Sequence, residues 1–266
     1  MKNDNIPKKL NRVFEELAQS IKEDAKKPRK STGFLAIDKL TTGLVDEDLV
    51  VIASRPAMGK TALALDIANH LARESSKTTV LFSLEISKEQ IVRRLQRASG
   101  TEYKKEDNLV IYDDPWMTVR KICDICESTE NLGAIIIDYF NLLDDPAYHT
   151  NSKDRFSRAY NSKSRDLKLL AKELKVPVIC TAQLGRQVDY RDDKRPLFKD
   201  LNAYGVLQQD ADQVLLLYRD RYYNPETPLG DIAECIVVKN RHGDCGTVKL
   251  RWDPEKATFR DEETVQ

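Results

Sequence analysis

Several features that would assign this sequence to a class at once are missing. It has only five cysteines, without the spacing of a disulfide framework, so we predict a reduced, cytoplasmic protein. No stretch approaches the roughly 18 apolar residues of a membrane span, and the polar start at residues 1–4 lacks a signal peptide's apolar core. The formal net charge is zero, because 43 basic residues balance 43 acidic ones, which excludes a bulk polycation. Contact with nucleic acid would therefore need a local basic surface.

The sequence does contain enough apolar residues, 41% of 266, for a real core, and they fall in alternating strand-like and helix-like segments. Apolar runs such as 134–137 and 176–179 show no period of two, so both faces of these strands should be covered. We predict an α/β fold with a mainly parallel sheet and helices on both faces. The last three strands have no helix between them and predict an antiparallel extension at one edge, with a hairpin tip at 241–244. Strands are expected at 49–54, 79–84, 109–112, 133–138, 176–181, 213–218, 233–239 and 247–252, and helices at 60–73, 87–98, 117–129 and 154–174.

The first 30 residues differ from the rest. Apolar residues recur at helical spacing and form one stripe, after which Pro28 and a basic run end the helix. A single amphipathic helix has no core of its own. It would bury its stripe against the main domain or against another copy of the chain. The stripe consists of Leu10, Val13, Phe14, Leu17 and Ile21.

The segment 54–61 directly follows the apolar run 49–53 and precedes a helix-compatible stretch, which is the context that a nucleotide-phosphate loop needs. Backbone N–H groups at such a helix start converge on anionic oxygens. We expect Lys60 to reach the β- and γ-phosphates of a nucleotide and Thr61 to bind Mg²⁺. The alternative is an ordinary strand-to-helix turn with a solvated lysine. The expected nucleotide-binding residues are Ser54, Arg55, Pro56, Ala57, Met58, Gly59, Lys60 and Thr61.

Two carboxylates end predicted strands, where an α/β sheet faces its ligand crevice. Asp138 closes the run 135–138 and would hold the Mg²⁺ water shell beside Thr61; otherwise it is a strand-end acid in a turn. Glu85 ends the run 80–85 and would take a proton from the water that attacks the γ-phosphate. Its alternative role is to cap the helix that Ser87 begins.

Three further polar residues follow strands. Gln183 comes after the strand at 176–181, where an amide can sense whether a γ-phosphate is present. Lys239 and Arg241 lie at the exit of the strand at 233–239, and could reach the γ-phosphate of a neighbouring subunit and stabilise transition-state charge there. The alternative for this pair is a solvated hairpin tip.

Cys123 and Cys126 form a Cys-x-x-Cys pair within a helical segment. A zinc site normally needs a second pair of ligands, and the three histidines are scattered along the chain. Two thiols packed on a helix face are the preferred interpretation.

These residues also carry a family resemblance: the chain resembles the RecA-type motor domain of DnaB-like replicative helicases. The resemblance runs in order over residues 31–259. Its segments are Ser31–Phe34, Leu40–Leu44, Arg55–Thr61, Phe82–Glu85, Ile137–Tyr139, Leu170–Leu174, Gln183–Arg186, Asp193–Pro196, Gln209–Asp212, Leu217–Asp220 and Lys239–Gly243.

The resemblance implies a RecA-like P-loop NTPase fold and a homohexameric ring that hydrolyses ATP with Mg²⁺ and translocates on single-stranded DNA. It implies that Glu85 is the base, Gln183 the sensor, and Lys239 and Arg241 the cations supplied in trans. Residues 1–30 would then be a linker helix and basic tether that docks on a neighbouring subunit, 31–259 the motor domain, and 260–266 a tail. A helicase loader is a further possible partner.

The sequence departs from the family pattern in two places that affect its partners. The family's N-terminal helical domain, which contacts primase, is absent, so no primase contact is predicted. The DNA-facing loop normally reads Asp-Leu-Arg-Glu-Ser-Gly, whereas here residues 200–205 place Asn202 at the arginine position. Losing one phosphate contact lowers both the affinity for DNA and its salt dependence. Backbone N–H groups near Gly205 can still bind phosphate, and Tyr204 can stack on a base.

Basic segments elsewhere could compensate for the missing arginine. Lys153, Arg155 and Arg186 are the expected DNA contacts among them, although the segment around Arg186 also carries acids and is nearly neutral overall. Two alternative functions stay open. One is a RecA- or RadA-like recombination ATPase, and the other is a ring subunit or regulator that keeps ATP sites without translocating.

Overall fold

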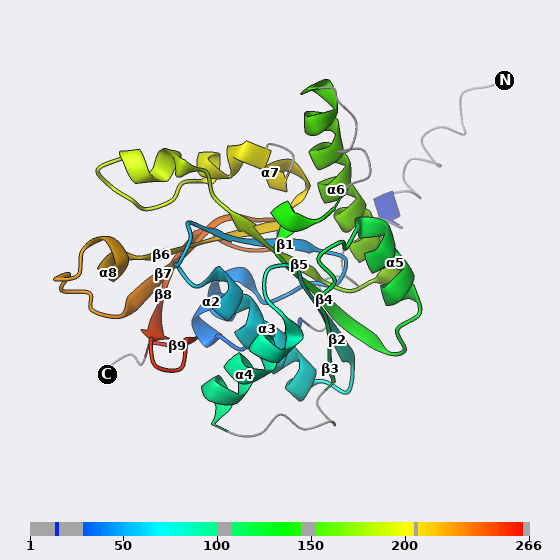
Figure 1. Cartoon of the computed structure of the whole chain (residues 1–266), viewed down its shortest axis with the longest axis horizontal. Coiled ribbons are helices and arrows are strands. Elements are labelled where there is room, and N and C mark those ends of the chain that lie inside the picture. Colours follow the sequence, from blue (N-terminus) through cyan, green and yellow to red (C-terminus); the bar gives the residue numbers. More distant parts are fainter. Residues whose placement is uncertain (1–13, 16–28, 101–107, 145–152, 205–206, 263–266) are drawn as a thin grey trace.

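The computed structural model describes residues 14–15, 29–100, 108–144, 153–204 and 207–262, with the backbone alone for residues 153–162 and 202–204. Its centre is a nine-stranded sheet in the order β3-β2-β4-β5-β1-β6-β7-β8-β9 (Figure 1). The strands are β1 (Leu49–Ser54), β2 (Thr78–Ser83), β3 (Leu109–Tyr112), β4 (Leu132–Asp138), β5 (Val178–Gln183), β6 (Gln213–Arg219), β7 (Ile232–Asn240), β8 (Gly246–Asp253) and β9 (Thr258–Asp261).

Helices cover both faces of this sheet, as Figure 1 shows, with α2, α3 and α4 on one side and α5 and α6 on the other. Side chains alternate between the two faces along each strand. In β1, Val51 packs in the core that includes α5 and α6, whereas Ile52 packs in the core that includes α2, α3 and α4. Double coverage explains why all six residues of β1 are buried. The helices are α2 (Leu35–Thr41), α3 (Lys60–Glu74), α4 (Lys88–Ser99), α5 (Val119–Glu127), α6 (Lys153–Leu174), α7 (Leu207–Asp210) and α8 (Asp220–Tyr223), with short 3-10 turns η1 (Phe140–Leu142), η3 (Arg186–Tyr190) and η4 (Phe198–Tyr204).

The two ends of the parallel strands carry chemically different residues. The parallel strands end together, because Ser54 pairs with Gln183 and Ser83 pairs with Asp138 in register. Strand β7 runs antiparallel to β6, so its last residue, Asn240, pairs with the first residue of β6. Residues that follow β7 therefore lie near the first residues of the parallel strands, opposite to the last residues of β1, β2, β4 and β5.

The predicted α/β architecture with an antiparallel extension is confirmed, and most predicted elements begin and end within two residues of the observed ones. The elements that were missed include β9 and α2, besides the four-residue helices α7 and α8 and the 3-10 turns. Strand β9 is four residues long and buries only Phe259, and α2 buries only Ile37 and Thr41, so neither has enough period to be recognised. Strand β9 continues through Asp261, two residues beyond the boundary predicted at 259. Within the described residues, no helix is long and apolar enough to cross a membrane.

Candidate nucleotide-binding site

The loop between β1 and α3 adopts a conformation that depends on a glycine. Gly59 caps α3 with φ of +100°, in the left-handed region that favours glycine. A Cβ atom at this position would lie 2.7 Å from Cζ of Phe259, so a side chain would also collide with β9. The first N–H groups of a helix have no partner within the helix, and α3 begins directly after this loop. The loop is thus shaped to present backbone donors to an anion.

Lys60, the first residue of α3, brings a buried ammonium group to the same place. Its Nζ lies 3.3 Å from Oε2 of Glu85 and 3.9 Å from Oδ1 of Asp138, and 3.5 Å from the hydroxyl of Thr61. It also lies 4.4 Å from the ring centroid of Tyr139. The structure therefore brings together four of the residues that the sequence predicted for one site: Lys60, Thr61, Glu85 and Asp138.

Asp138 fits the environment of a hydrated metal ion. It is 2% exposed, and its Oδ1 accepts a hydrogen bond from Thr181 at 2.5 Å. Its Oδ2 is buried and has no hydrogen-bond partner among the described residues. A buried carboxylate oxygen normally has a partner, so an unpaired one beside a phosphate loop suits the water shell of Mg²⁺.

Glu85 is not a helix cap. Helix α4 is capped by Ser87, whose side chain accepts from the backbone of Gln90 while the Gln90 side chain accepts from the backbone of Ser87. The capping box satisfies that helix terminus without Glu85. The Glu85 side chain is about half exposed, at 47%, and points to Lys60.

Lys60, Thr61 and Glu85 line a cavity of about 400 Å³ that also includes Gln183, at the end of β5. The backbone N–H of Gln183 donates to Oδ1 of Asn141 at 3.2 Å. The lining side chains that were not expected from the sequence include Arg94 and Arg97 of α4, and Trp252 of β8. The two arginines make this side of the cavity basic, as an anionic ligand requires.

Arg55 and Ser54 contribute chiefly to the shape of the loop. The guanidinium of Arg55 binds both carboxylate oxygens of Asp189, at 3.1 and 2.5 Å, and donates to the carbonyl of Leu184. This pairing holds the pKa of Asp189 below its usual value. The hydroxyl of Ser54 donates to the carbonyl of Arg55 at 2.8 Å. The phosphate loop is thus tied to the segment that follows β5.

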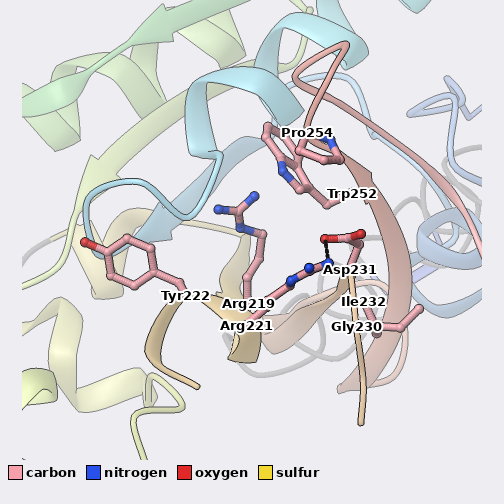
Figure 2. A pocket seen from close by; sticks show the side chains of 8 residues that line it. All are labelled: Arg219, Arg221, Tyr222, Gly230, Asp231, Ile232, Trp252 and Pro254. Carbon is pink, nitrogen blue, oxygen red and sulfur yellow. Dashed lines mark hydrogen bonds and ion pairs between the residues drawn. The ribbon is translucent and has the colours of Figure 1, made fainter. Parts of the chain in front are cut away.

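A second recess of about 290 Å³ opens beside the loop (Figure 2). One wall of the recess is the guanidinium of Arg219. This group donates to the carbonyl of Ala57 at 3.0 Å and lies 4.4 Å from the ring centroid of Trp252. Figure 2 shows the Arg219 guanidinium between Trp252 and Tyr222. Burial lowers the pKa of Arg219. No role was predicted for these residues from the sequence, although Arg219 lay in one of the family segments.

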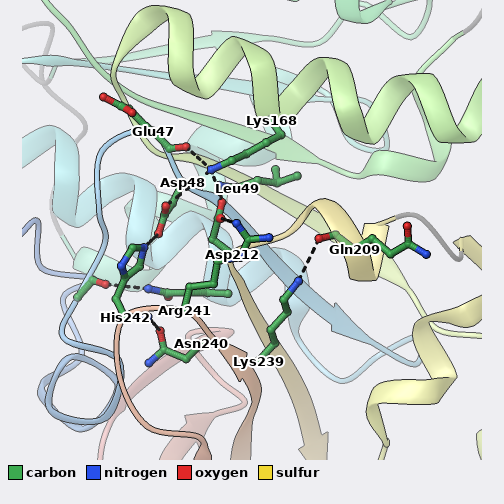
Figure 3. Close-up of polar contacts among 12 residues, drawn as sticks. Glu47, Asp48, Leu49, Lys168, Gln209, Asp212, Lys239, Asn240, Arg241 and His242 are labelled. Atoms are coloured by element: carbon green, nitrogen blue, oxygen red, sulfur yellow. Dashed lines mark hydrogen bonds and ion pairs between the residues drawn. The ribbon is translucent and has the colours of Figure 1, made fainter. Parts of the chain in front are cut away.

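Lys239 and Arg241 lie near the first residues of the parallel strands, opposite to the phosphate loop (Figure 3). The length of β1 separates that end of the strands from the phosphate loop, and six residues at about 3.3 Å each span some 16 Å or more. Nζ of Lys239 donates to the carbonyls of Gln208, at 2.7 Å, and Gln209, at 3.1 Å. Nη1 of Arg241 lies 3.1 Å from Oδ1 of Asp212. The two cations therefore cannot reach an anion held by their own loop.

A buried acidic pair lies next to Arg241. Asp48 is 2.7 Å from Nε2 of His242, and burial together with the nearby Asp212 raises the pKa of Asp48 to about 7. Nζ of Lys168 on α6 lies 2.6 Å from Asp212 and 3.8 Å from Asp48. Burial lowers the pKa of His242. Arg241 thus belongs to a network of charges rather than to a freely solvated hairpin tip.

The expected DNA contacts are only partly described. Arg186 begins η3 and is exposed. Lys153 and Arg155 lie in the first turns of α6, and Asn202 and Tyr204 lie in η4, with the backbone alone described. Gly205 lies outside the described residues. Around Arg186, the pairs Arg191–Asp200 and Arg195–Glu234, both at 2.6 Å, agree with the nearly neutral segment expected there.

The Cys-x-x-Cys pair lies on α5, where Cys126 is buried and burial raises the pKa of its thiol to about 12. Cys123 is half-buried beside it. Among the described residues, no group of three or more His, Cys, Asp or Glu side chains is placed to hold a metal ion. The two thiols pack on a helix face, in line with the preferred interpretation.

Comparison with known proteins adds a family to this geometry. The model of the DnaB-like helicase C terminal domain matches residues 30–106 and 96–261. The replicative DNA helicase DnaC of Bacillus subtilis (strain 168) is 37% identical over 254 residues, which cover 86% of this chain and 55% of the relative. The replicative DNA helicase DnaB of Geobacillus stearothermophilus is 38% identical over the same shares of the two chains. The chain thus spans about half the length of the curated relatives it matches.

Solved structures give the same result. One of them, an ATPase domain, aligns with a TM-score of 0.80 at 32% identity, covering 98% of this chain and 100% of that one. A DnaB-like replicative helicase, solved to study its interactions with primase, aligns with a TM-score of 0.81 at 33% identity, covering 98% of this chain and 69% of that one. The RadB recombinase, at 17% identity and a TM-score of 0.62, shares the fold alone. By its family match and its identity to these relatives, the chain belongs to the DnaB-like helicase C terminal domain family.

Proposed function

We propose that this chain is the ATP-dependent motor of a hexameric DNA helicase ring. One observation carries the proposal. A phosphate loop with its acids lies at the C-terminal ends of the parallel strands, and Lys239 and Arg241 lie at their N-terminal ends. A subunit built in this way holds a nucleotide at one face and presents cations from the other. Identical subunits arranged head to tail would then complete each other's sites, as a closed ring requires.

The loop side would bind ATP. Backbone N–H groups at the start of α3 and the ammonium of Lys60 would hold the phosphates, and the Glu85 and Asp138 carboxylates now facing Lys60 would give way to them. Thr61 and Asp138 would hold Mg²⁺, which neutralises phosphate charge when it is bound. The unpaired Oδ2 of Asp138 supports this assignment.

Hydrolysis would use the groups at the ends of β2 and β5. Glu85 is the candidate base, because a half-exposed carboxylate that lines the cavity can accept a proton from the attacking water. Gln183 is the candidate sensor, because its strand ends in the same cavity and its backbone is tied to Asn141. The recess of Arg219 and Trp252 would take the flat base, since a guanidinium and an aromatic ring both stack on planar groups.

Lys239 and Arg241 would act on the neighbouring subunit's ATP. A cation supplied in trans stabilises the charge of the transition state and contributes roughly 10³- to 10⁵-fold to the rate. Dependence on a neighbour would also explain the amphipathic stripe expected in residues 1–30, which we propose docks on that neighbour. Of that segment the structure describes Phe14 and Glu15, and Phe14 is 60% exposed.

Single-stranded DNA is the proposed track, with Lys153, Arg155, Arg186, Asn202, Tyr204 and Gly205 as the candidate contacts. The relatives named as replicative DNA helicases support DNA as the polymer. A recombination ATPase has weaker support, because RadB shares only the fold. Asn202, at a position where the family has arginine, favours as second candidate a ring subunit that does not translocate. Unwinding, strand exchange and DNA-stimulated ATP turnover, assayed on the same preparation, separate the three.

Mixing two inactive variants tests the shared site. Lys60→Ala should abolish hydrolysis because it removes the phosphate ligand, and Arg241→Ala should abolish it while nucleotide binding remains. In a mixed ring, some pockets pair an intact Lys60 from one chain with an intact Arg241 from the next. We expect the mixture to recover ATP hydrolysis that neither variant has alone, with ring assembly followed by native mass measurement. A mixture as inactive as its components would contradict the proposal.

A further inference from the structure

One short segment of the chain holds both proposed trans-acting cations. The carbonyls of Gln208 and Gln209 accept from Nζ of Lys239, and Asp212 accepts from the side chain of Arg241. Figure 3 shows Lys239 beside Gln209 and Arg241 beside Asp212. The carbonyl of Asp212 also accepts from the backbone N–H of Arg241 at 3.1 Å. The position of each cation therefore depends on residues 208–212, at the junction of α7 and β6.

The two ends of this segment are anchored differently. Asp212 is 2% exposed, and its Oδ2 accepts from the backbone N–H of Leu49 at 2.8 Å and from Lys168 at 2.6 Å. That end is fixed to the first strand of the sheet and to α6. Breaking a buried ion pair is strongly destabilising, so Arg241 has a fixed anchor.

The other end is tied to a different part of the molecule. Nε2 of the half-buried Gln208 donates to the carbonyl of Phe198 at 2.5 Å. Phe198 is the first residue of η4, the turn that contains the DNA-facing residues proposed above. Gln208 therefore contacts η4 with its side chain and Lys239 with its backbone carbonyl, and so joins the two.

The anchor of Lys239 leaves its charge available. Backbone carbonyls are neutral, and two of them occupy only two of the three donors of an ammonium group. Burial, and then the nearby Arg241, lower the pKa of Lys239, which is the expected direction where no carboxylate offsets the charge fully. A cation of this kind is sensitive to position, because a displacement of about 1 Å can change a rate by roughly 100-fold.

We propose that Gln208 is a positioning residue: its side-chain amide transmits the position of η4 to the carbonyls that hold Lys239. Nucleic acid bound by one subunit would then set the place of the cation that this subunit presents to its neighbour's ATP. The inference rests on the proposed function, because it takes η4 as the DNA-facing turn and Lys239 as a cation acting in trans. It adds a physical route from the polymer to the chemistry that runs through a single side chain.

Two variants of Gln208 and a control variant of Gln209 test this route. Gln208→Ala removes the amide that contacts Phe198, and Gln208→Glu keeps the size of the side chain but removes the N–H donor. Gln209→Ala is the control, because it removes an identical amide from the adjacent, exposed position and keeps the carbonyl that binds Lys239. The measurements are ATP turnover by the assembled ring of the full chain with and without a thymidine oligonucleotide, oligonucleotide affinity by fluorescence anisotropy, and the melting temperature.

For both Gln208 variants we expect the oligonucleotide affinity and the melting temperature of the parent, while the ratio of stimulated to basal turnover falls roughly twofold or more. Gln209→Ala should keep the parental ratio. A Gln208 variant with the parental ratio overturns the inference but leaves the proposed function standing. The inference is equally overturned if basal rate and melting temperature fall together with the ratio, because that result indicates a purely structural role. A parental ring that the oligonucleotide does not stimulate overturns the proposed function and this inference with it.

Discussion

Asp66 on α3 should make the stability of the protein depend on pH near neutrality. Its two carboxylate oxygens accept from the hydroxyl of Thr258, at 2.6 Å, and from the backbone N–H of Phe259, at 2.8 Å. Burial raises the pKa of Asp66 from 3.8 to about 7, although both hydrogen bonds act in the opposite direction. The folded protein therefore binds this proton more tightly than the unfolded chain does.

The sign and size of the effect follow from this difference. A carboxyl with a raised pKa in the folded state stabilises the fold most below the unfolded value of 3.8, and that contribution is lost as the pH rises through about 7. Each pH unit in this window is worth about 1.4 kcal/mol. Between pH 6 and pH 8 the loss from Asp66 is about 1.4 kcal/mol in all, because the group is fully ionised near the upper limit. In a domain of this size that corresponds to a decrease of about 3–5 °C in melting temperature.

Asp66→Asn removes the titration and keeps an oxygen acceptor, so its free energy of unfolding should change less between pH 6 and pH 8 than that of the parent. Urea unfolding of the nucleotide-free protein at the two pH values measures the change in the free energy of unfolding. Other titrating groups, such as Asp48, contribute equally to this change in the variant and in the parent. Asp244→Asn, at an exposed position, is the control and should behave like the parent. Equal pH dependence in Asp66→Asn and the parent would refute the reasoning.

Two further predictions concern nucleotide binding, measured with a fluorescent ATP analogue. Gly59→Ala forces a residue with a side chain into a left-handed conformation and against Phe259, so the affinity for the ATP analogue should fall roughly tenfold or more. The control is Gly185→Ala, which should bind like the parent because a Cβ atom at that position meets nothing within 4 Å. Arg219→Ala removes one wall of the recess beside Trp252, and affinity for ATP should fall roughly tenfold while affinity for inorganic triphosphate is unchanged, because only ATP carries a base. An equal loss for both ligands would place Arg219 on the phosphates instead.

Local pattern accounts for much of what the sequence predicted. The phosphate loop lies between a fully buried strand and a long helix, and both are visible as apolar runs, so Lys60 and Thr61 could be assigned directly. Asp138 and Glu85 could be assigned because acids that follow parallel strands share one edge of the sheet. Parallel topology converts separate positions in the sequence into one site, and that step needs no side-chain detail.

The remaining features depend on contacts that no local pattern encodes. The pairing of Arg219 with Trp252 joins β6 to β8 across an antiparallel extension whose register the sequence did not specify. The anchor of Lys239 consists of backbone carbonyls, which every residue type supplies, so residue identity gives no signal. Strand β9 was missed for a similar reason, since its contribution is one ring beneath Gly59 and two donors to Asp66.

The position of β9 has a consequence for the order in which the protein matures. The phosphate loop is complete by residue 61, yet the ring that supports Gly59 is Phe259, nearly 200 residues later in translation. A ribosome would thus have to release almost the whole of this sequence before the loop gains its final support. A chain interrupted shortly before Thr258 would keep every residue of the loop and lack the strand that shapes it. We therefore expect nucleotide affinity to depend on the presence of β9.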